Sequence, residues 1–174
     1  MTWKRVLFYL GIIIASLMVQ NNLFAASNLI GTVPNILLII TFTFGFLRGK
    51  TDGMLIGFVS GLLLDSFFGE TLGFYALVYL VIGYGNGLLG QVFYTEFINM
   101  PVVICILSDF IFNIIIYFFD FLMRGKMSFF RYLQKVILPE IVYTVLLTLV
   151  LYRFLRFLNT KFAQFEKRSA KKFV

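Results

Sequence analysis

The stretch GMLIGFVSGLLLD, residues 53–65, decides the fold because a small residue recurs in it at every fourth position. Gly53, Gly57 and Gly61 lie on one face of a helix, and Asp65 continues the same count. Lipid supplies no hydrophobic drive for helix association, so membrane helices associate by close backbone packing at such small residues. The stretch therefore predicts a membrane helix that packs closely against another helix.

Two glycines in the next apolar segment, Gly83 and Gly87, repeat this spacing. Because adjacent segments both carry glycine faces, we favour packing within the chain over packing against another molecule. The alternative is that the faces belong to a groove for a partner helix. The candidates for either role are Gly53, Gly57, Gly61, Gly83 and Gly87.

Composition places the chain in a membrane. Of the 174 residues, 60% are hydrophobic and 13% are charged, whereas a soluble domain is about 45–50% apolar and about 25% charged. With no histidine and a single cysteine, Cys105, the chain lacks His-based acid–base chemistry, His-ligated metal sites and an intrachain disulfide. The sequence also lacks a phosphate-binding glycine loop and any metal-ligand spacing. We expect a protein that is not an enzyme and that carries no cofactor or metal.

Six apolar segments predict an all-α, polytopic membrane protein with a single domain, residues 1–174. The segments at 34–47 and 53–68 are short, so this pair either barely crosses the bilayer or forms a re-entrant hairpin. A basic cytoplasmic tail, 159–174, follows the last span. The six predicted spans are 6–24, 34–47, 53–68, 72–93, 101–123 and 136–158.

The distribution of basic residues predicts the orientation. If the N-terminus is cytoplasmic, that side carries eleven of the 15 Lys and Arg residues, which predicts that both termini are cytoplasmic. The basic tail indicates contact with anionic lipid rather than with nucleic acid. Residues 128–137 predict either a short helix in the outer interface or an ordinary hydrophobic loop that leads into the last span. The candidate lipid or interface anchors are Arg131, Lys135, Arg153 and Arg156.

Polar residues inside the predicted spans are the candidate buried sites, because such groups are costly in lipid. They are Asp65, Asn86, Asp109, Asn113 and Glu140. Asp65 lies near the outer end of its span, where we expect partial hydration. Asp109 and Asn113 share a helix face and predict a hydrogen-bonded centre that either holds helices together or lines a ligand cavity.

Ion pairs offer a simple role for the acids near the outer boundary. Asp120 or Glu140 can pair there with Arg131 or Lys135. We favour these pairs over a proton relay, because no chain of carboxylates crosses the bilayer in the sequence. An ion- or proton-coupled transporter is therefore the least favoured class of function.

An ordered set of short motifs runs through the first half of the chain. The motifs are Pro34-Asn35-Ile36-Leu37-Leu38, Arg48-Gly49, Gly53, Gly57-Phe58, Gly61-Leu62-Leu63-Leu64-Asp65, Leu72-Gly73 and Gly83-Tyr84. Together with Gln20 and Pro139, this set resembles the rod shape-determining protein family MreD. The chain departs from the family's pattern at Asn35, where we expect an aspartate, and at Tyr143, where an asparagine is common.

This resemblance implies a bacterial membrane scaffold that regulates cell-wall elongation and cell shape. The implied partners are MreC, a protein with one membrane span, together with the glycan polymerase RodA and its penicillin-binding transpeptidase. The family's fold is similar to the S-components of energy-coupling-factor vitamin transporters. That similarity leaves an alternative, a small-molecule binding subunit of a transporter, because fold alone does not determine function.

Overall fold

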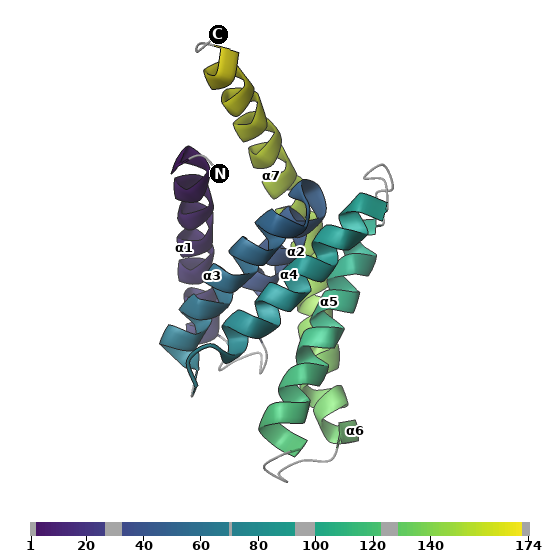
Figure 1. Cartoon of the computed structure of the whole chain (residues 1–174). Coiled ribbons are helices and arrows are strands. Elements are labelled where there is room, and N and C mark those ends of the chain that lie inside the picture. The colour runs from purple at the N-terminus through teal and green to yellow at the C-terminus, as the bar shows by residue number, and fades with distance from the viewer. Residues whose placement is uncertain (1–2, 27–32, 70, 93–99, 123–128, 172–174) are drawn as a thin grey trace.

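The computed structural model describes residues 3–26, 33–69, 71–92, 100–122 and 129–171, and these residues form helices without any strand (Figure 1). The prediction of an all-α membrane protein with six helical segments is confirmed. Five helices are long and apolar enough to cross a membrane, and the sixth is shorter. The elements are α1 (Trp3–Ala26), α2 (Ile36–Arg48), α3 (Lys50–Phe68), α4 (Phe74–Val92), α5 (Met100–Ile116), η2 (Tyr117–Leu122), α6 (Phe129–Tyr132), η3 (Leu133–Ile137) and α7 (Leu138–Lys171).

The short helix α2 lies at the centre of the bundle. Every residue from Ile36 to Phe46 is buried, and α2 packs against α1, α3, α4, α5 and α7. Its 13 residues span about 20 Å, less than the roughly 30 Å hydrocarbon core of a bilayer. A helix surrounded by protein does not have to match the thickness of the lipid, and its apolar sequence on all sides fits that position.

A tight turn joins α2 to α3. Gly49 has φ +97°, a conformation that glycine adopts without steric cost, and its N–H donates to the Gly45 carbonyl at 2.8 Å. Helix α3 begins at once with Lys50 and contains 19 residues, about 28 Å. The third segment is therefore longer than the 16 residues predicted from its apolar stretch.

The predicted glycines lie where α3 crosses α4. A Cβ atom on Gly53 would stand 2.3 Å from the Gly83 carbonyl oxygen, and one on Gly57 would stand 2.3 Å from the Tyr79 carbonyl oxygen. Gly61 is equally crowded, at 2.4 Å from the Tyr75 carbonyl oxygen. The backbones of α3 and α4 are thus in direct contact.

The fifth glycine, Gly87, faces the start of α3, where a Cβ atom would stand 2.3 Å from Lys50 Cα. All five glycines singled out from the sequence therefore face helices of this chain. Since α4 occupies the glycine face of α3, that face is not a groove for a partner helix.

The last helix is continuous with the segment before it. Residues 129–137 form α6 and the π-helical turn η3, and α7 follows without a break, so they are neither a separate interfacial helix nor an irregular lead-in. Pro139 lacks the N–H that would bond to the carbonyl four residues earlier, and a local π-helical turn is a common response to such a gap. At its other end α7 runs to Lys171 and projects beyond the bundle, so the predicted basic tail is helical as far as that residue (Figure 1).

The glycine contact generates a test with a matched control. Replacing Gly57 by alanine forces α3 away from α4, and we expect the free energy of unfolding to fall by about 1–3 kcal/mol. Gly85 is also helical, but a Cβ atom on it would meet nothing within 4 Å, so Gly85→Ala should be neutral or slightly stabilising. Thermal unfolding in detergent measures both variants, and equal stability of the two would contradict the packing described.

Candidate functional site

The N-terminus of α2 is buried at membrane depth, and its backbone N–H groups are bonded to side chains. The Leu37 N–H donates to Gln20 Oε1 of α1 at 3.1 Å, and the Leu38 N–H donates to Asn35 Oδ1 at 3.1 Å. Asn35 is thus the N-cap residue of α2. Its Oδ1 also accepts a hydrogen bond from the Tyr79 hydroxyl of α4 at 2.6 Å.

Helix α7 completes this cap from the other side. The Asn35 N–H donates to Thr144 Oγ1 at 3.3 Å. The Thr148 hydroxyl donates to the Thr144 carbonyl at 2.7 Å and lies 3.1 Å from Cys105 Sγ of α5. A single buried asparagine therefore joins α2, α4 and α7, while Gln20 adds α1. We call Gln20, Asn35, Tyr79 and Thr144 the α2 cap.

Asp65 caps the N-terminus of a second helix, α4. It accepts hydrogen bonds from the N–H groups of Gly73 at 2.9 Å, Tyr75 at 2.9 Å and Ala76 at 3.0 Å. The expectation of partial hydration is wrong, because Asp65 is only 2% exposed. The carboxylate accepts the hydrogen bonds that the N–H groups at the start of α4 would otherwise make to water. Its negative charge also interacts favourably with the dipole of α4.

Asn86 joins α4 to α5. Its side-chain amide and the Ser108 hydroxyl exchange hydrogen bonds, at 2.9 and 3.1 Å, and its Nδ2 also donates to the Ile82 carbonyl. Both residues are buried, so each satisfies the other's polar atoms inside the bundle.

Asp109, Asn113 and Glu140 lie together between α5 and α7. Asn113 Nδ2 donates to the backbone carbonyl of Asp109 at 3.0 Å, not to its carboxylate. Glu140 is close enough to both residues to interact with them electrostatically. Asp109 is fully buried, and its carboxylate interacts with Thr144 of α7. The centre predicted from Asp109 and Asn113 therefore also contains a second acid, Glu140.

Two neighbouring acids can exchange a proton with each other or bind a polar group. A proton relay across the membrane needs further titratable groups along its path. Arg131 and Lys135 are exposed, and in the part of the chain that the structure describes neither pairs with Glu140. The side chain of Asp120 lies outside the described residues. The described chain also contains no group of three His, Cys, Asp or Glu residues placed to hold a metal ion.

A small cavity lies between the α2 cap and Glu140. Its volume is about 160 Å³, and polar side chains on its wall include Gln20, Asn35, Tyr79 and Glu140. Sites for drug-sized ligands measure about 300–1,000 Å³. The cavity can therefore hold water or a very small polar group, and the polar centre acts mainly to join helices.

Another polar cluster lies at the opposite end, where α2 turns into α3. The Tyr9 hydroxyl donates to Asp52 Oδ2 at 2.6 Å, and Arg5 pairs with the same oxygen at 3.7 Å. Arg48 Nε donates to Asn159 Oδ1, so α7 is joined to the turn as well. Helices α1, α2, α3 and α7 meet at this cluster.

A shallow groove separates α1 from α3 at the edge of the bundle. Its volume is about 160 Å³. The only hydroxyl on its wall belongs to Tyr9 and is already bonded to Asp52, so the groove is apolar. The lining residues are Val6, Tyr9, Leu10, Ile13, Leu55, Ile56 and Val59.

Several residues of these clusters carry no clear signal in the sequence. Tyr79 and Thr144 occur inside apolar segments at no distinctive spacing. Asp52 does carry one, because it is an isolated acid beside Arg48 and Lys50 in the turn, where a carboxylate is expected to pair with a cation.

Comparison with known proteins bears on nearly the whole chain. A family model described as rod shape-determining protein MreD matches residues 3–162. No curated protein and no solved structure matches the chain. The matched range includes the α2 cap, the glycine contact and the α1–α3 groove.

The α2 cap predicts a difference between two substitutions at one position. Asn35→Ala leaves the Leu38 N–H and the Tyr79 hydroxyl without an acceptor, and we expect it to lower the free energy of unfolding by about 1–3 kcal/mol. Asn35→Asp keeps the acceptor oxygen and should remain near the wild type in thermal unfolding. If Asn35→Ala were as stable as Asn35→Asp, the cap would not support the fold.

Proposed function

The chain belongs to the MreD family of rod shape-determining proteins, and from this premise we propose that it is a non-enzymatic membrane scaffold that binds MreC. Membership of this family implies a role in determining rod shape, and together with the apolar helices it implies a membrane protein. The scaffold role, the binding of MreC and the association with RodA and its penicillin-binding transpeptidase are the proposal.

The observation that carries this proposal is the apolar groove between α1 and α3. One wall of the groove is α3. This wall is rigid, because the opposite face of α3 is in backbone contact with α4 through Gly53 and Gly57. Its other wall is α1, which packs against α2 and α3 and stands at the edge of the bundle (Figure 1).

The dimensions of the groove fit side chains rather than a whole helix. A volume of about 160 Å³ accommodates the protruding side chains of a helix that lies along the surface. Leu55 of α3 is 40% exposed beside it, and Ile14 of α1 is 47% exposed. The membrane span of MreC, a single apolar helix, is a partner with this chemistry.

The charge distribution supports the orientation that the scaffold needs. Arg48 and Lys50 flank the turn between α2 and α3, and Arg5 pairs with Asp52 beside it. Arg153 and Arg156 lie shortly before Asn159 of α7, which bonds to Arg48 at the same turn. By the positive-inside rule this end is cytoplasmic in a bacterial plasma membrane, with both termini on that side. The extracytoplasmic part of MreC is then on the opposite side.

The alternative, a vitamin-binding subunit, is less well supported by the dimensions of the polar site. The cavity beside Glu140 has a volume of about 160 Å³, below the range typical of small-molecule sites. The buried polar cavity therefore does not favour a vitamin-binding subunit, and we retain the MreC-binding proposal.

Disulfide cross-linking tests the groove. In a Cys105→Ser background, a cysteine at Leu10 or Val59 should cross-link to cysteines along one face of the MreC membrane helix. Leu146 of α7 is 57% exposed and provides the control, since it is away from the groove. Cross-links are measured in membranes from cells that produce both proteins.

A bulky substitution that fills the groove provides a second test, with co-purification of MreC as the readout. Val59→Trp should lower co-purification of MreC by about tenfold, as expected when a central interface pocket is blocked. Leu146→Trp should leave it unchanged. Cross-linking at Leu146 but at neither groove position would contradict the assignment, even if MreC still co-purified.

A further inference from the structure

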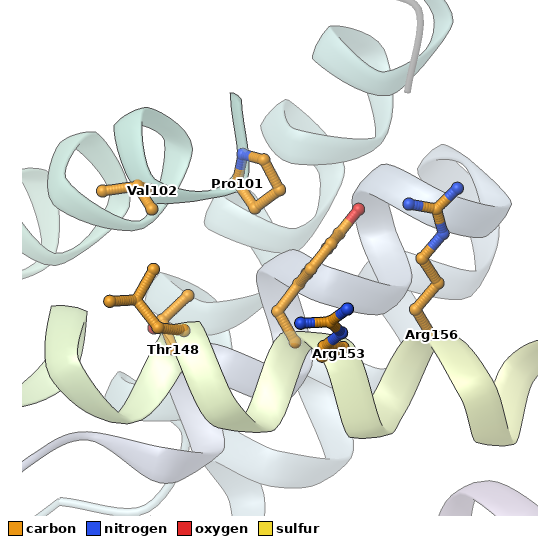
Figure 2. Close-up of a pocket in the computed structure, with 7 residues that line it drawn as sticks. Pro101, Val102, Thr148, Arg153 and Arg156 are labelled. Atoms are coloured by element: carbon orange, nitrogen blue, oxygen red, sulfur yellow. The ribbon is translucent and has the colours of Figure 1, made fainter. Parts of the chain in front are cut away.

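A larger pocket lies between α5 and α7, away from the α1–α3 groove. Its volume is about 510 Å³, within the range of small-molecule sites and about three times that of either cavity described above. Figure 2 shows Pro101 and Val102 of α5 facing a row of α7 residues that includes Thr148, Arg153 and Arg156. The family assignment and the MreC groove leave this pocket without a role.

One end of the pocket is cationic. Arg153 and Arg156 are three residues apart on α7, and both line the pocket. In Figure 2 the Arg156 side chain extends away from α7, while the Arg153 guanidinium lies close to that helix. Neither forms an ion pair within the described part of the chain. Tyr152 also lines the pocket, close enough to Arg156 for an electrostatic interaction. Two guanidinium groups and a phenol are donors suited to the oxygens of a phosphate.

The other end of the pocket is apolar. Pro101, Val102 and Leu149 form its wall, and Leu149 is 57% exposed. Thr148 is the exception, but its hydroxyl already donates to the Thr144 carbonyl. A soluble anion would leave this wall uncovered, whereas an acyl chain would cover it.

The position of the pocket along α7 fits a lipid headgroup. Arg153 and Arg156 are the first basic residues of α7 and lie near the end of its predicted span, 136–158. Asn159, three residues after Arg156, bonds to Arg48 at the turn between α2 and α3. Basic pockets between membrane helices bind the headgroups of anionic lipids. The N-terminus of α5 beside the pocket adds partial positive charge.

We propose that this pocket binds one anionic phospholipid, with its phosphate held by Arg153 and Arg156 and an acyl chain along Val102 and Leu149. This inference does not depend on MreC binding, because it uses other helices and another chemistry. The bound lipid would fasten α7 to the start of α5. The site differs from general contact with anionic lipid because it requires both the two arginines and the apolar wall.

Thermal unfolding of the purified full-length protein tests the site. We expect phosphatidylglycerol to raise the melting temperature, since a ligand that binds the folded state stabilises it, and phosphatidylcholine with the same chains to have little effect. Arg153→Gln/Arg156→Gln should weaken the phosphatidylglycerol effect at least about tenfold in lipid concentration. Arg131→Gln/Lys135→Gln removes the same charge from exposed positions of α6 and η3 and should preserve the effect.

Each of the following results would overturn the proposal. Equal stabilisation by phosphatidylcholine would exclude recognition of charge, and equal stabilisation by glycerol phosphate would indicate a soluble anion instead of a lipid. An equal loss in the Arg131/Lys135 variant would indicate general attraction by net charge. If the Arg153/Arg156 variant does not fold, Val102→Phe supplies the test: it fills the apolar wall, keeps both charges and should abolish the phosphatidylglycerol effect, and retention of that effect would overturn the site.

Discussion

The first backbone N–H groups of α2 have no acceptor within their own helix, and this imposes the main constraint on the bundle. A helix start inside a membrane has no water to bond, so its donors must find acceptors within the protein. Here Gln20 of α1 and Asn35 supply them, and Tyr79 and Thr144 hold Asn35 in place from α4 and α7. The positions of three surrounding helices thus follow from the hydrogen bonds that one buried helix end requires.

The groove proposed for MreC follows from this arrangement. With α2 buried, α3 and α4 pack over it, and their backbones come into contact at Gly53, Gly57 and Gly83. That contact occupies one face of α3 and leaves another toward α1, where the apolar groove lies. A rigid α3 beside the peripheral helix α1 suits a scaffold. The binding site is already ordered, so partner binding loses little conformational entropy there.

The sequence predicts features that depend on spacing and composition. The glycine period in residues 53–65 indicated close helix packing, and the apolar segments indicated six helices. The partners of individual polar residues could not be predicted, because they depend on how the helices are rotated and packed against one another. Asn86 bonds to Ser108, and Asp65 caps α4 rather than remaining partly hydrated. Likewise, shortness alone could not distinguish a buried central helix from a re-entrant segment at 34–47.

The central claim is that the bundle around α2 is formed before the partner binds. Hydrogen–deuterium exchange of the full-length protein, alone and with MreC, tests it most directly, because exchange reports local opening. The account predicts slow exchange in α2 from Leu37 onward in both samples, with added protection only along α1 and α3 in the complex. Rapid exchange in α2 without MreC, followed by protection when MreC is added, would contradict it.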